Sequence, residues 1–453
     1  MAIGSILFII CLGAATFLFY RSVSTIRRNI LLGRDVDRSD NSSLRWKTML
    51  RVALGQSKMV VRPVAGFLHI IVYVGFVIIN IEILEIIIDG IFGTHRIFSS
   101  WIGVDAYRFF INCFEILAFL VLVACVIFLI RRNVVKIARF WKPEMKGWPA
   151  SDANLILVAE VLLMAAFLTM DAADVLLMQT NAEALTSAGL GKYAINWTGN
   201  GFVVSSFIAG LLPSDTATLH IIERFCWWFH ILGILAFLNY LAISKHLHII
   251  LAFPAVYFSN LKSKGEFDNL ASVKKEVELM FDPSADPYSA PPEPDENALP
   301  EAFGAKDVKD LSWKQLMDSY SCTECGRCTS ECPANQTGKL LSPRKIMMDT
   351  RDRVTEYGKS IDKNGADAED GKTLIYDYIS PEELWACTSC NACTEACPIN
   401  LDPLSIIVDL RRYLVMEKSA APAELNNMFT NIENNGAPWQ FAQADRLNWK
   451  DEA

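Results

Sequence analysis

The distribution of apolar residues divides the chain into two parts. The first 260 residues contain long apolar runs, each near the 20 residues that a helix needs to cross the hydrocarbon core of a bilayer. The candidate spanning helices are residues 3–20, 64–89, 109–130, 153–177 and 219–252, the last long enough to emerge from the bilayer. A sixth apolar stretch, residues 201–213, is short and broken by Gly and Pro, so we expect it on the membrane surface or against the bundle. The pattern predicts five spans.

The positive charges between these runs indicate an orientation. The loops 21–63 and 131–152 hold 16 Lys and Arg residues, whereas the loops 90–108 and 178–218 hold three. By the positive-inside rule, the two basic loops lie in the cytoplasm, the N-terminus lies outside, and everything after the fifth span is cytoplasmic. The first span has neither a basic leading segment nor a convincing small-residue cleavage site, so we expect it to stay attached.

Beyond residue 260 the pattern becomes that of a small water-exposed domain. Residues 262–280 predict a short amphipathic helix, and residues 281–300 are rich in Pro, Asp, Glu and Ser, as in an exposed linker. Helical patterning recurs at 311–320, 341–356, 381–386 and 401–417, with Ser342-Pro343 and Asp402-Pro403 as helix starts. The chain is therefore predicted to be all-α throughout.

Composition excludes several classes of protein. Apolar residues make up 52% of the chain and charged residues 20%, which disfavours a purely cytosolic globule. The formal net charge of −8 argues against a protein that binds nucleic acid, because such binding needs a basic face. Abundant large apolar residues and the lack of a short repeat exclude collagen-like, coiled-coil and disordered chains.

Eight of the twelve cysteines form two short runs. The first reads Cys322-Thr-Glu-Cys325-Gly-Arg-Cys328-Thr-Ser-Glu-Cys332-Pro333, and residues 387–398 repeat the same C-x2-C-x2-C-x3-C-P spacing. Three thiolates on one tight loop can bind three irons of a cubane, while the fourth cysteine serves the other cluster. Zinc sites instead pair two C-x2-C knuckles, and a disulfide framework does not fit a reducing compartment. The runs predict two [4Fe–4S] clusters, one on Cys322, Cys325, Cys328 and Cys397, the other on Cys387, Cys390, Cys393 and Cys332.

Histidine is scarce, with six residues in the chain, and several lie in the predicted spans. Ionisable residues inside a bilayer are costly and tend to be functional, so a b-type haem between helices is the natural hypothesis. His69 and His248 lie in the same cytoplasmic leaflet on facing helices and form the best ligand pair. His230 precedes His248 by five helical turns on one face and would serve an outer haem. His246 is expected to point away from His248 toward the headgroups.

Several acids also lie in or beside the predicted spans. Some are expected to line a path for protons or quinol, whereas Glu85, Asp89 and Asp171 are expected at helix ends that face the outer water. Arg62 and Lys245 are candidate partners for haem propionates. The acids within the predicted bundle are Glu82, Glu85, Glu115, Glu160, Asp171 and Glu223.

The membrane part resembles a known family of cytochromes. Five spans, His69-Ile-Ile-Val-Tyr-Val-Gly75-Phe, and Ser244-Lys245-His246-Leu-His248 followed by Pro254 resemble the dihaem cytochrome b (gamma) subunit of respiratory nitrate reductase. They also resemble its relatives in membrane-bound heterodisulfide reductase (the E subunit) and electron-transfer-flavoprotein:menaquinone oxidoreductase.

This resemblance implies haem ligands and a quinone substrate. It assigns His69 and His248 to a haem on the cytoplasmic side, assigns His230 to an outer haem, and implies menaquinone or another quinone as the substrate. Ile79 stands where the family has a second histidine in span two. A single haem, or an outer haem that uses His95 or His220, therefore stays open.

The second part resembles the helical ferredoxin domains of the heterodisulfide reductase C subunit and of succinate dehydrogenase-type iron–sulfur subunits. The resemblance covers about 311–417 and rests on both cysteine runs, on Ser342-Pro343-Arg344-Lys345 and on Pro398-Ile-Asn400. The expected organisation is a five-helix transmembrane bundle (1–260), an amphipathic helix and linker (261–310), a small helical ferredoxin domain with two clusters (311–418) and a polar tail (419–453).

Together the two resemblances imply an electron-transfer subunit of a quinone-linked respiratory oxidoreductase in a bacterial or archaeal cytoplasmic membrane. Such a subunit would pass electrons between the quinone pool, b haem, two clusters and a soluble partner. Because the chain lacks a dinucleotide fingerprint and a CCG-type cysteine domain, the partner is expected to be a CCG-domain subunit like heterodisulfide reductase B, or an electron-transfer flavoprotein. The alternative is an iron–sulfur redox sensor or membrane assembly anchor without quinone chemistry.

Overall fold

The computed structural model describes residues 3–194, 202–284, 303–365 and 369–451. Within these ranges the regular structure is helical, and the only β pairing is in two isolated bridges, Arg34 with Ser312 and Ile375 with Ile379. The all-α prediction is confirmed.

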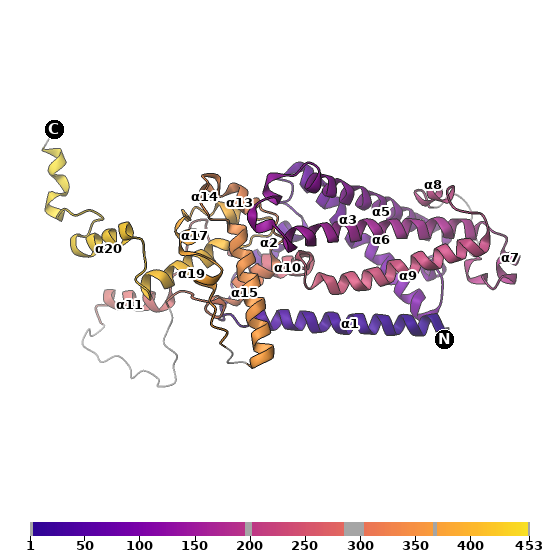
Figure 1. Cartoon of the computed structure of the whole chain (residues 1–453), viewed down its shortest axis with the longest axis horizontal. Coiled ribbons are helices and arrows are strands. Elements are labelled where there is room, and N and C mark those ends of the chain that lie inside the picture. The colour runs from indigo at the N-terminus through magenta and orange to yellow at the C-terminus, as the bar shows by residue number, and fades with distance from the viewer. Residues whose placement is uncertain (1–2, 195–201, 285–302, 366–368, 452–453) are drawn as a thin grey trace.

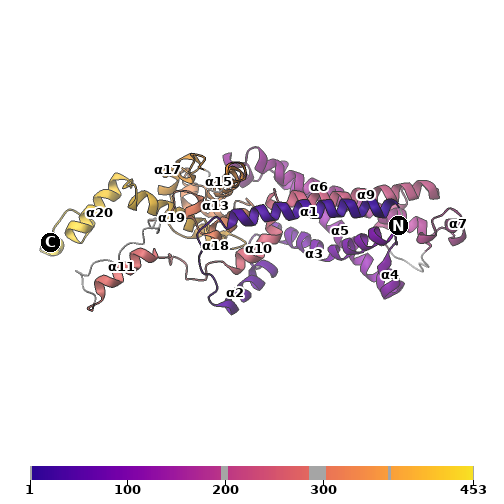
Figure 2. The same cartoon turned by 90° about the horizontal axis from the view of Figure 1, so that it is seen from below.

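Five of the helices are long and apolar enough to cross a membrane, and they lie side by side as an elongated bundle (Figures 1 and 2). Large apolar side chains such as Phe17, Phe67 and Phe225 are exposed on them, as expected where lipid surrounds the protein. The helices extend beyond the predicted runs because hydropathy marks only their apolar centres. The five are α1 (Ile3–Ile30), α3 (Pro63–Phe92), α5 (Val104–Asn133), α6 (Trp148–Met178) and α9 (Thr216–Leu241).

The fifth span is shorter than the sequence predicts. Helix α9 ends at Leu241, residues Lys245–Leu247 form a short 3₁₀ turn (η5), and a separate helix, α10, covers His248–Tyr257. The Ser244 side chain accepts a hydrogen bond from the His246 N–H at 3.2 Å and so caps the new turn. The predicted single helix over 219–252 is wrong, and His230 and His248 therefore do not share one helical face.

Short helices connect the spans. In the predicted stretch 201–213, residue 201 lies outside the described residues and helix α8 follows. Ser205 Oγ in this helix donates to the Leu168 carbonyl of α6 at 2.9 Å, so the stretch packs against the bundle. The connecting elements are α2 (Ser42–Met49), the π-helix η1 (Leu50–Leu54), α4 (Ile97–Ile102), η2 (Ala138–Phe140), η3 (Pro143–Met145), α7 (Ala182–Ser187), η4 (Gly191–Tyr193) and α8 (Ser205–Ala209).

The second half contains a compact group of helices, called here the helical domain (α12–α19). The Ser342 and Asp402 side chains accept hydrogen bonds from the backbone N–H groups of Lys345 and Ser405, so both predicted helix starts are confirmed. The helices are α12 (Trp313–Ser321), α13 (Arg327–Glu331), α14 (Pro333–Gln336), α15 (Pro343–Asn364), α16 (Leu374–Asp377), α17 (Pro381–Trp385), α18 (Ala392–Ala396) and α19 (Pro403–Met416); η6 (Val308–Asp310) precedes them.

Two further segments flank the helical domain. Helix α11 (Ala271–Phe281) covers the second half of the predicted amphipathic segment and ends one residue beyond it. Helix α20 (Ala423–Asn435) and the 3₁₀ segment η7 (Gln443–Lys450) extend away from the rest of the molecule at the C-terminal end (Figure 1).

The helical domain is packed directly onto one end of the bundle, called here the bundle base (residues 31–62, 134–147 and 241–257). A single hydrophobic core contains Leu247 and Val256 of the base together with Leu316 of α12. The Gly33–Arg34 backbone lies against residues 311–313, with Arg34 N–H donating to the Leu311 carbonyl at 2.8 Å. A Cβ at Gly33 would lie 2.6 Å from the Trp313 nitrogen, so this approach requires glycine. These contacts fix the domain to the bundle. Most of the predicted linker (285–302) lies outside the described residues.

Candidate metal centres

The two cysteine runs adopt the same backbone conformation. In the first, Glu324 and Gly326 have positive φ before the short helix α13; in the second, Ser389 and Asn391 take the same two places before α18. These left-handed residues turn the chain sharply and gather three cysteines on each loop. A Cβ at Gly326 would lie 2.5 Å from the Arg344 guanidinium, so a larger residue there would displace the end of the Arg344 side chain.

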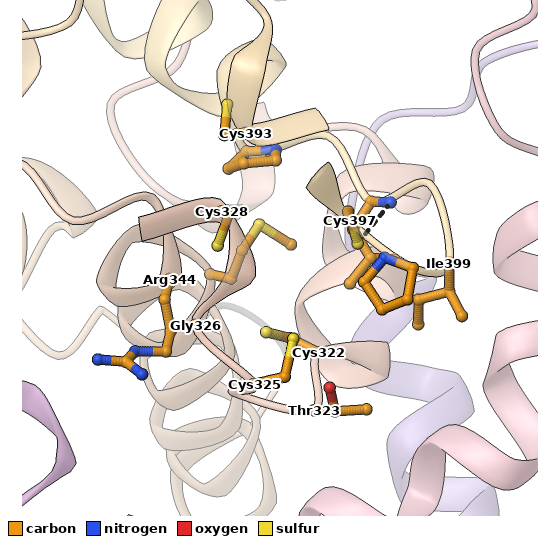
Figure 3. Close-up of a pocket in the computed structure, with 13 residues that line it drawn as sticks. Cys322, Thr323, Cys325, Gly326, Cys328, Arg344, Cys393, Cys397 and Ile399 are labelled. Atoms are coloured by element: carbon orange, nitrogen blue, oxygen red, sulfur yellow. Dashed lines mark hydrogen bonds between the residues drawn. The ribbon is translucent and has the colours of Figure 1, made fainter. Parts of the chain in front are cut away.

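The first loop opens into a cavity of about 390 Å³, its mouth included. Cys322, Cys325 and Cys328 line it, and Cys397 of the second run faces them from the other side (Figure 3). Cys393 also contributes to the wall. The structure therefore brings together the four cysteines that the sequence assigns to one cluster.

The chemistry of this cavity fits iron. Burial raises the pKa of the Cys322 and Cys397 thiols to about 12, so without a cation they stay protonated. A bound metal would deprotonate them and offset the burial of the thiolates. The Leu401 N–H lies 3.3 Å from Cys397 Sγ, a contact that stabilises negative charge on the sulfur. All twelve cysteines are free of disulfides, which disfavours a disulfide framework.

The other four cysteines of the two runs are Cys332, Cys387, Cys390 and Cys393, and some of them influence one another electrostatically. Burial raises the pKa of the Cys387 thiol, and the electrostatic influence of Cys332 and Cys390 adds to this rise, which places the three near one another. Burial raises the pKa of the Cys393 thiol as well, and the electrostatic influence of Cys387 adds to this rise. Cys332 and Cys393 are buried, whereas Cys390 is exposed. Cys332 thus lies near the second loop, just as Cys397 lies near the first.

Residues of the two basic loops contact side chains that lie on or beside the first cavity. The Arg327 guanidinium donates to the Lys58 carbonyl at 2.8 Å, and Lys58 Nζ donates to Asn400 Oδ1 at 2.9 Å. Arg344, which is fully buried, donates to the Arg139 carbonyl at 2.7 Å and to Glu144 at 2.6 Å. Burial lowers the pKa of Arg139 to about 10, so it remains charged at neutral pH. The sequence pattern of these loops does not predict their contact with the helical domain.

Glu324 joins the first cysteine loop to the turn that carries two histidines. Its buried carboxylate forms ion pairs with Lys245 and, at 2.7 Å, with Arg351. These two cations outweigh burial and lower the pKa of Glu324. Lys245 also donates to the Pro149 carbonyl, while Arg62 donates to Ser330 and Glu331. Lys245 and Arg62, the candidate partners for haem propionates, thus contact side chains and carbonyls of the protein.

Three histidine rings meet where α3 begins and α10 begins. The ring centroids of His69 and His248 are 6.4 Å apart, and those of His246 and His248 are 5.7 Å apart with the rings nearly parallel. The expectation that His246 points away from His248 is wrong, because the two residues belong to a 3₁₀ turn and a new helix instead of one α-helix. The His248 Nδ1 atom lies 3.0 Å from the Lys245 carbonyl, whereas Nδ1 of His69 and of His246 is buried without a partner.

His230 lies apart from this group. Its Nδ1 atom is 3.0 Å from the Leu163 carbonyl, its ring contacts the Phe167 ring at 5.7 Å, and its Nε2 atom is buried without a partner. Among the ring contacts of the described residues, no histidine lies against it. His95 instead lies 3.1 Å from Asp174, and the His220 ring packs against Tyr193.

The acids near the far end of the bundle do not face outer water as expected. Glu85, Asp89 and Asp171 are buried. Arg96, from the loop after α3, reaches in among the helices: its Nη2 atom lies 2.5 Å from Asp171 Oδ1 and its backbone N–H donates to Asp89 at 2.6 Å. The Arg96 guanidinium between the helices makes burial of these carboxylates possible. No local sequence pattern predicts that Arg96 enters the bundle.

Comparisons with known proteins agree with the cysteine chemistry. Residues 321–401 match the family described as "4Fe-4S dicluster domain". The whole chain is similar to the probable iron-sulfur-binding oxidoreductase FadF of Bacillus subtilis, at 28% identity over 99% of this chain and 61% of that protein. It is also similar to the EtfAB:quinone oxidoreductase of Syntrophomonas wolfei, at 26% identity over 93% of this chain and 56% of that protein.

A shorter similarity involves heterodisulfide reductases. One subunit of the dihydromethanophenazine:CoB–CoM heterodisulfide reductase of Methanosarcina mazei is 32% identical over 32% of this chain and 35% of its own length. The chain thus spans about three fifths or less of the length of these relatives. No solved structure matches the chain. These findings support a multi-pass membrane protein with an iron–sulfur domain that acts in electron transfer.

Proposed function

We propose that this chain is the membrane electron-transfer subunit of a quinone-linked oxidoreductase. Electrons would pass between a quinone or quinol in the bilayer, a b-type haem in the bundle base and two [4Fe–4S] clusters in the helical domain. The observation that carries the proposal is the direct contact between the histidine turn and the first cysteine loop, made by Lys245 and Glu324.

The clusters take their ligands crosswise in this proposal. Three cysteines of the first loop and Cys397 hold the proximal cluster, next to the bundle base; Cys387, Cys390, Cys393 and Cys332 hold the distal cluster. Each cluster supplies a one-electron carrier when bound. The exposure of Cys390 supports the distal cluster as the exit toward a soluble partner.

His69 and His248 are the proposed haem ligands. The ring centroids of His69 and His248 lie 6.4 Å apart, a separation that would allow both imidazoles to hold one haem. The contact between His248 Nδ1 and a backbone carbonyl is typical of a metal-ligating histidine, because it leaves Nε2 for the metal. The outer haem that His230 would serve stays a sequence-based prediction.

The remaining parts of the proposal concern the surroundings of the chain. The sixteen-to-three charge asymmetry supports a cytoplasmic position for the helical domain, with the N-terminus outside, in the cytoplasmic membrane that we propose for a bacterial or archaeal cell. The similarity to an EtfAB:quinone oxidoreductase and to a heterodisulfide reductase supports an electron-transfer flavoprotein or a CCG-domain protein as soluble partner, and menaquinone or another quinone as substrate.

Visible spectra and quinol-driven reduction test this function. In the purified chain, His69→Ala and His248→Ala should each abolish the low-spin b-type spectrum and the reduction of the clusters by a quinol. Dithionite should still reduce the clusters, because their thiol ligands are untouched.

Two further histidines serve as comparisons. His220→Ala, at the far end of the bundle, should leave the spectrum unchanged. His246→Ala decides between the two neighbouring rings, since loss of the spectrum in this variant but not in His248→Ala would replace His248 by His246 as ligand. A chain without haem, or with haem indifferent to His69, would overturn the proposal and favour a sensor or assembly anchor.

A further inference from the structure

A cavity at the far end of the bundle, away from the helical domain, has no role in the electron route. Three elements converge on it: the loop after α3 brings His95, α6 brings Asp174 and α9 brings Glu223. One potential ligand atom from each of these residues lies within 4.8 Å of the other two. The Asp174 and Glu223 side chains are each 1% exposed. The cavity encloses about 270 Å³, counting its mouth.

The walls of this cavity carry more negative than positive charge. Besides Asp174 and Glu223, they include Glu82, Glu85 and Asp89, whereas the Arg96 guanidinium is the one permanent cation among the residues that line it. Arg224 pairs with Glu223 from outside the lining. Lys192 lies close enough to influence Glu223, Asp174 and Asp89. Five carboxylates against these three cations still leave an excess of negative charge in a buried place, which is costly unless protons or a further cation compensate it.

A polar atom in the wall still lacks a partner. Glu82 Oε2 is buried and accepts no hydrogen bond, and the Glu82 side chain is only 2% exposed. His95 Nε2 and Asp174 Oδ1 lie 3.1 Å apart and form an ion pair when the imidazole is protonated. Unpaired polar atoms buried beside a cavity indicate that a polar or charged ligand belongs there.

The three converging side chains are already held as metal ligands usually are. The other oxygen of Asp174 accepts from Arg96 Nε at 2.8 Å. Glu223 accepts from the Tyr193 hydroxyl at 2.6 Å, and the His95 ring lies 4.4 Å from the Tyr193 ring. Partners that orient ligating carboxylates and imidazoles from behind are a regular feature of metal sites.

We propose that His95, Asp174 and Glu223 bind one divalent cation of the zinc class. An imidazole with two carboxylates and no thiolate is a donor set that suits Zn²⁺. The cation would offset the excess negative charge and would fasten the loop after α3 to α6 and α9. This site is separate from the haem and cluster sites and does not rest on the proposed function.

Zinc titration of the purified full chain tests the site. After chelation and dialysis, the chain should bind one zinc ion per molecule on addition of zinc chloride, followed by calorimetry. X-ray absorption at the zinc edge should show nitrogen and oxygen ligands without sulfur, which distinguishes this site from zinc at emptied cysteine loops. His95→Ala should weaken binding at least about 100-fold.

Two other variants keep the outcome decisive. Glu223→Gln preserves the size of the side chain and should also lose zinc affinity, in case His95→Ala fails to fold. His220→Ala is the matched control, because the His220 ring also packs against Tyr193 but lies outside the group of three. Absence of zinc binding, sulfur among the ligands, or equal affinity in His95→Ala would overturn the site and leave protons as the compensating charge. Loss of the haem spectrum in His95→Ala would also overturn it, by assigning His95 to haem.

Discussion

The charge of Glu324 provides a sensitive test of the proposed proximal cluster. Glu324 lies between Cys322 and Cys325 and is 3% exposed, with Lys245 and Arg351 as its ion-pair partners. Glu324→Gln removes one negative charge and leaves both cations in place. A unit charge roughly 8 Å from a cluster, at an effective dielectric constant of about 20, changes the free energy of reducing that cluster by about 2 kcal/mol. For one electron this corresponds to about 90 mV. Because the reduced cluster is the more negative state, the midpoint potential should rise.

A redox titration followed by electron paramagnetic resonance measures this effect. We expect the proximal cluster of Glu324→Gln to shift by about 50–100 mV toward positive potential, with the distal cluster little changed. The matched control is Glu395→Gln, which removes a carboxylate between Cys393 and Cys397 that is 57% exposed and pairs with Lys264. At the dielectric constant of water the same separation is worth only about 0.5 kcal/mol, or about 20 mV. Equal shifts in both variants, or no shift in Glu324→Gln, would refute the placement of a cluster beside Glu324.

Three further predictions concern ligation, acidity and packing. Cys397→Ser should destroy the paramagnetic signal of the proximal cluster although Cys397 belongs to the second run, and loss of the distal signal alone would contradict crosswise ligation. Burial raises the pKa of Asp349 to about 6, so the folded domain binds this proton more tightly than the unfolded chain does. The free energy of unfolding should therefore fall by up to about 3 kcal/mol as the pH rises from about 4 to 6. Asp349→Asn should flatten that slope in denaturation measured across this range, and an unchanged slope would assign the pH dependence to other groups. Leu316→Ala, in the core between the bundle base and the helical domain, should lower the free energy of unfolding by about 2–5 kcal/mol, measured by thermal or chemical unfolding. Leu340→Ala is the control and should lower it little, because the Leu340 side chain is 60% exposed. Equal losses of stability would show that this core does not hold the domain in place.

Local signals predicted what depends on local chemistry. The cap and proline pairs at Ser342 and Asp402 predicted two helix starts, and apolar run length predicted five spans. The sequence does not predict the break after Leu241, because no Pro or Gly lies between residues 234 and 253. That break depends on contacts distant in sequence, above all the pairing of Lys245 with Glu324 and with Asp152.

Long-range electrostatics also escaped the sequence. Nothing in the sequence near Arg96 shows that its loop folds back among Asp171, Asp174 and Glu82. The sequence therefore predicts outer water for Asp171, as for Glu85 and Asp89, although all three are buried. The meeting of His69 and His248 was expected from their common depth in the bilayer, whereas the approach of His246 required the 3₁₀ turn that the structure revealed.

The contacts of Lys58, Met59 and Arg139 with residues beside the first cavity have a consequence for biogenesis. Once the helical domain rests on the bundle base, these segments lie against Arg327 and Arg344, next to the first cysteine loop. Under the proposed ligation, we expect the proximal cluster to be inserted before the domain docks. Iron starvation during synthesis should then leave a membrane-inserted chain whose soluble part never docks and is open to proteolysis.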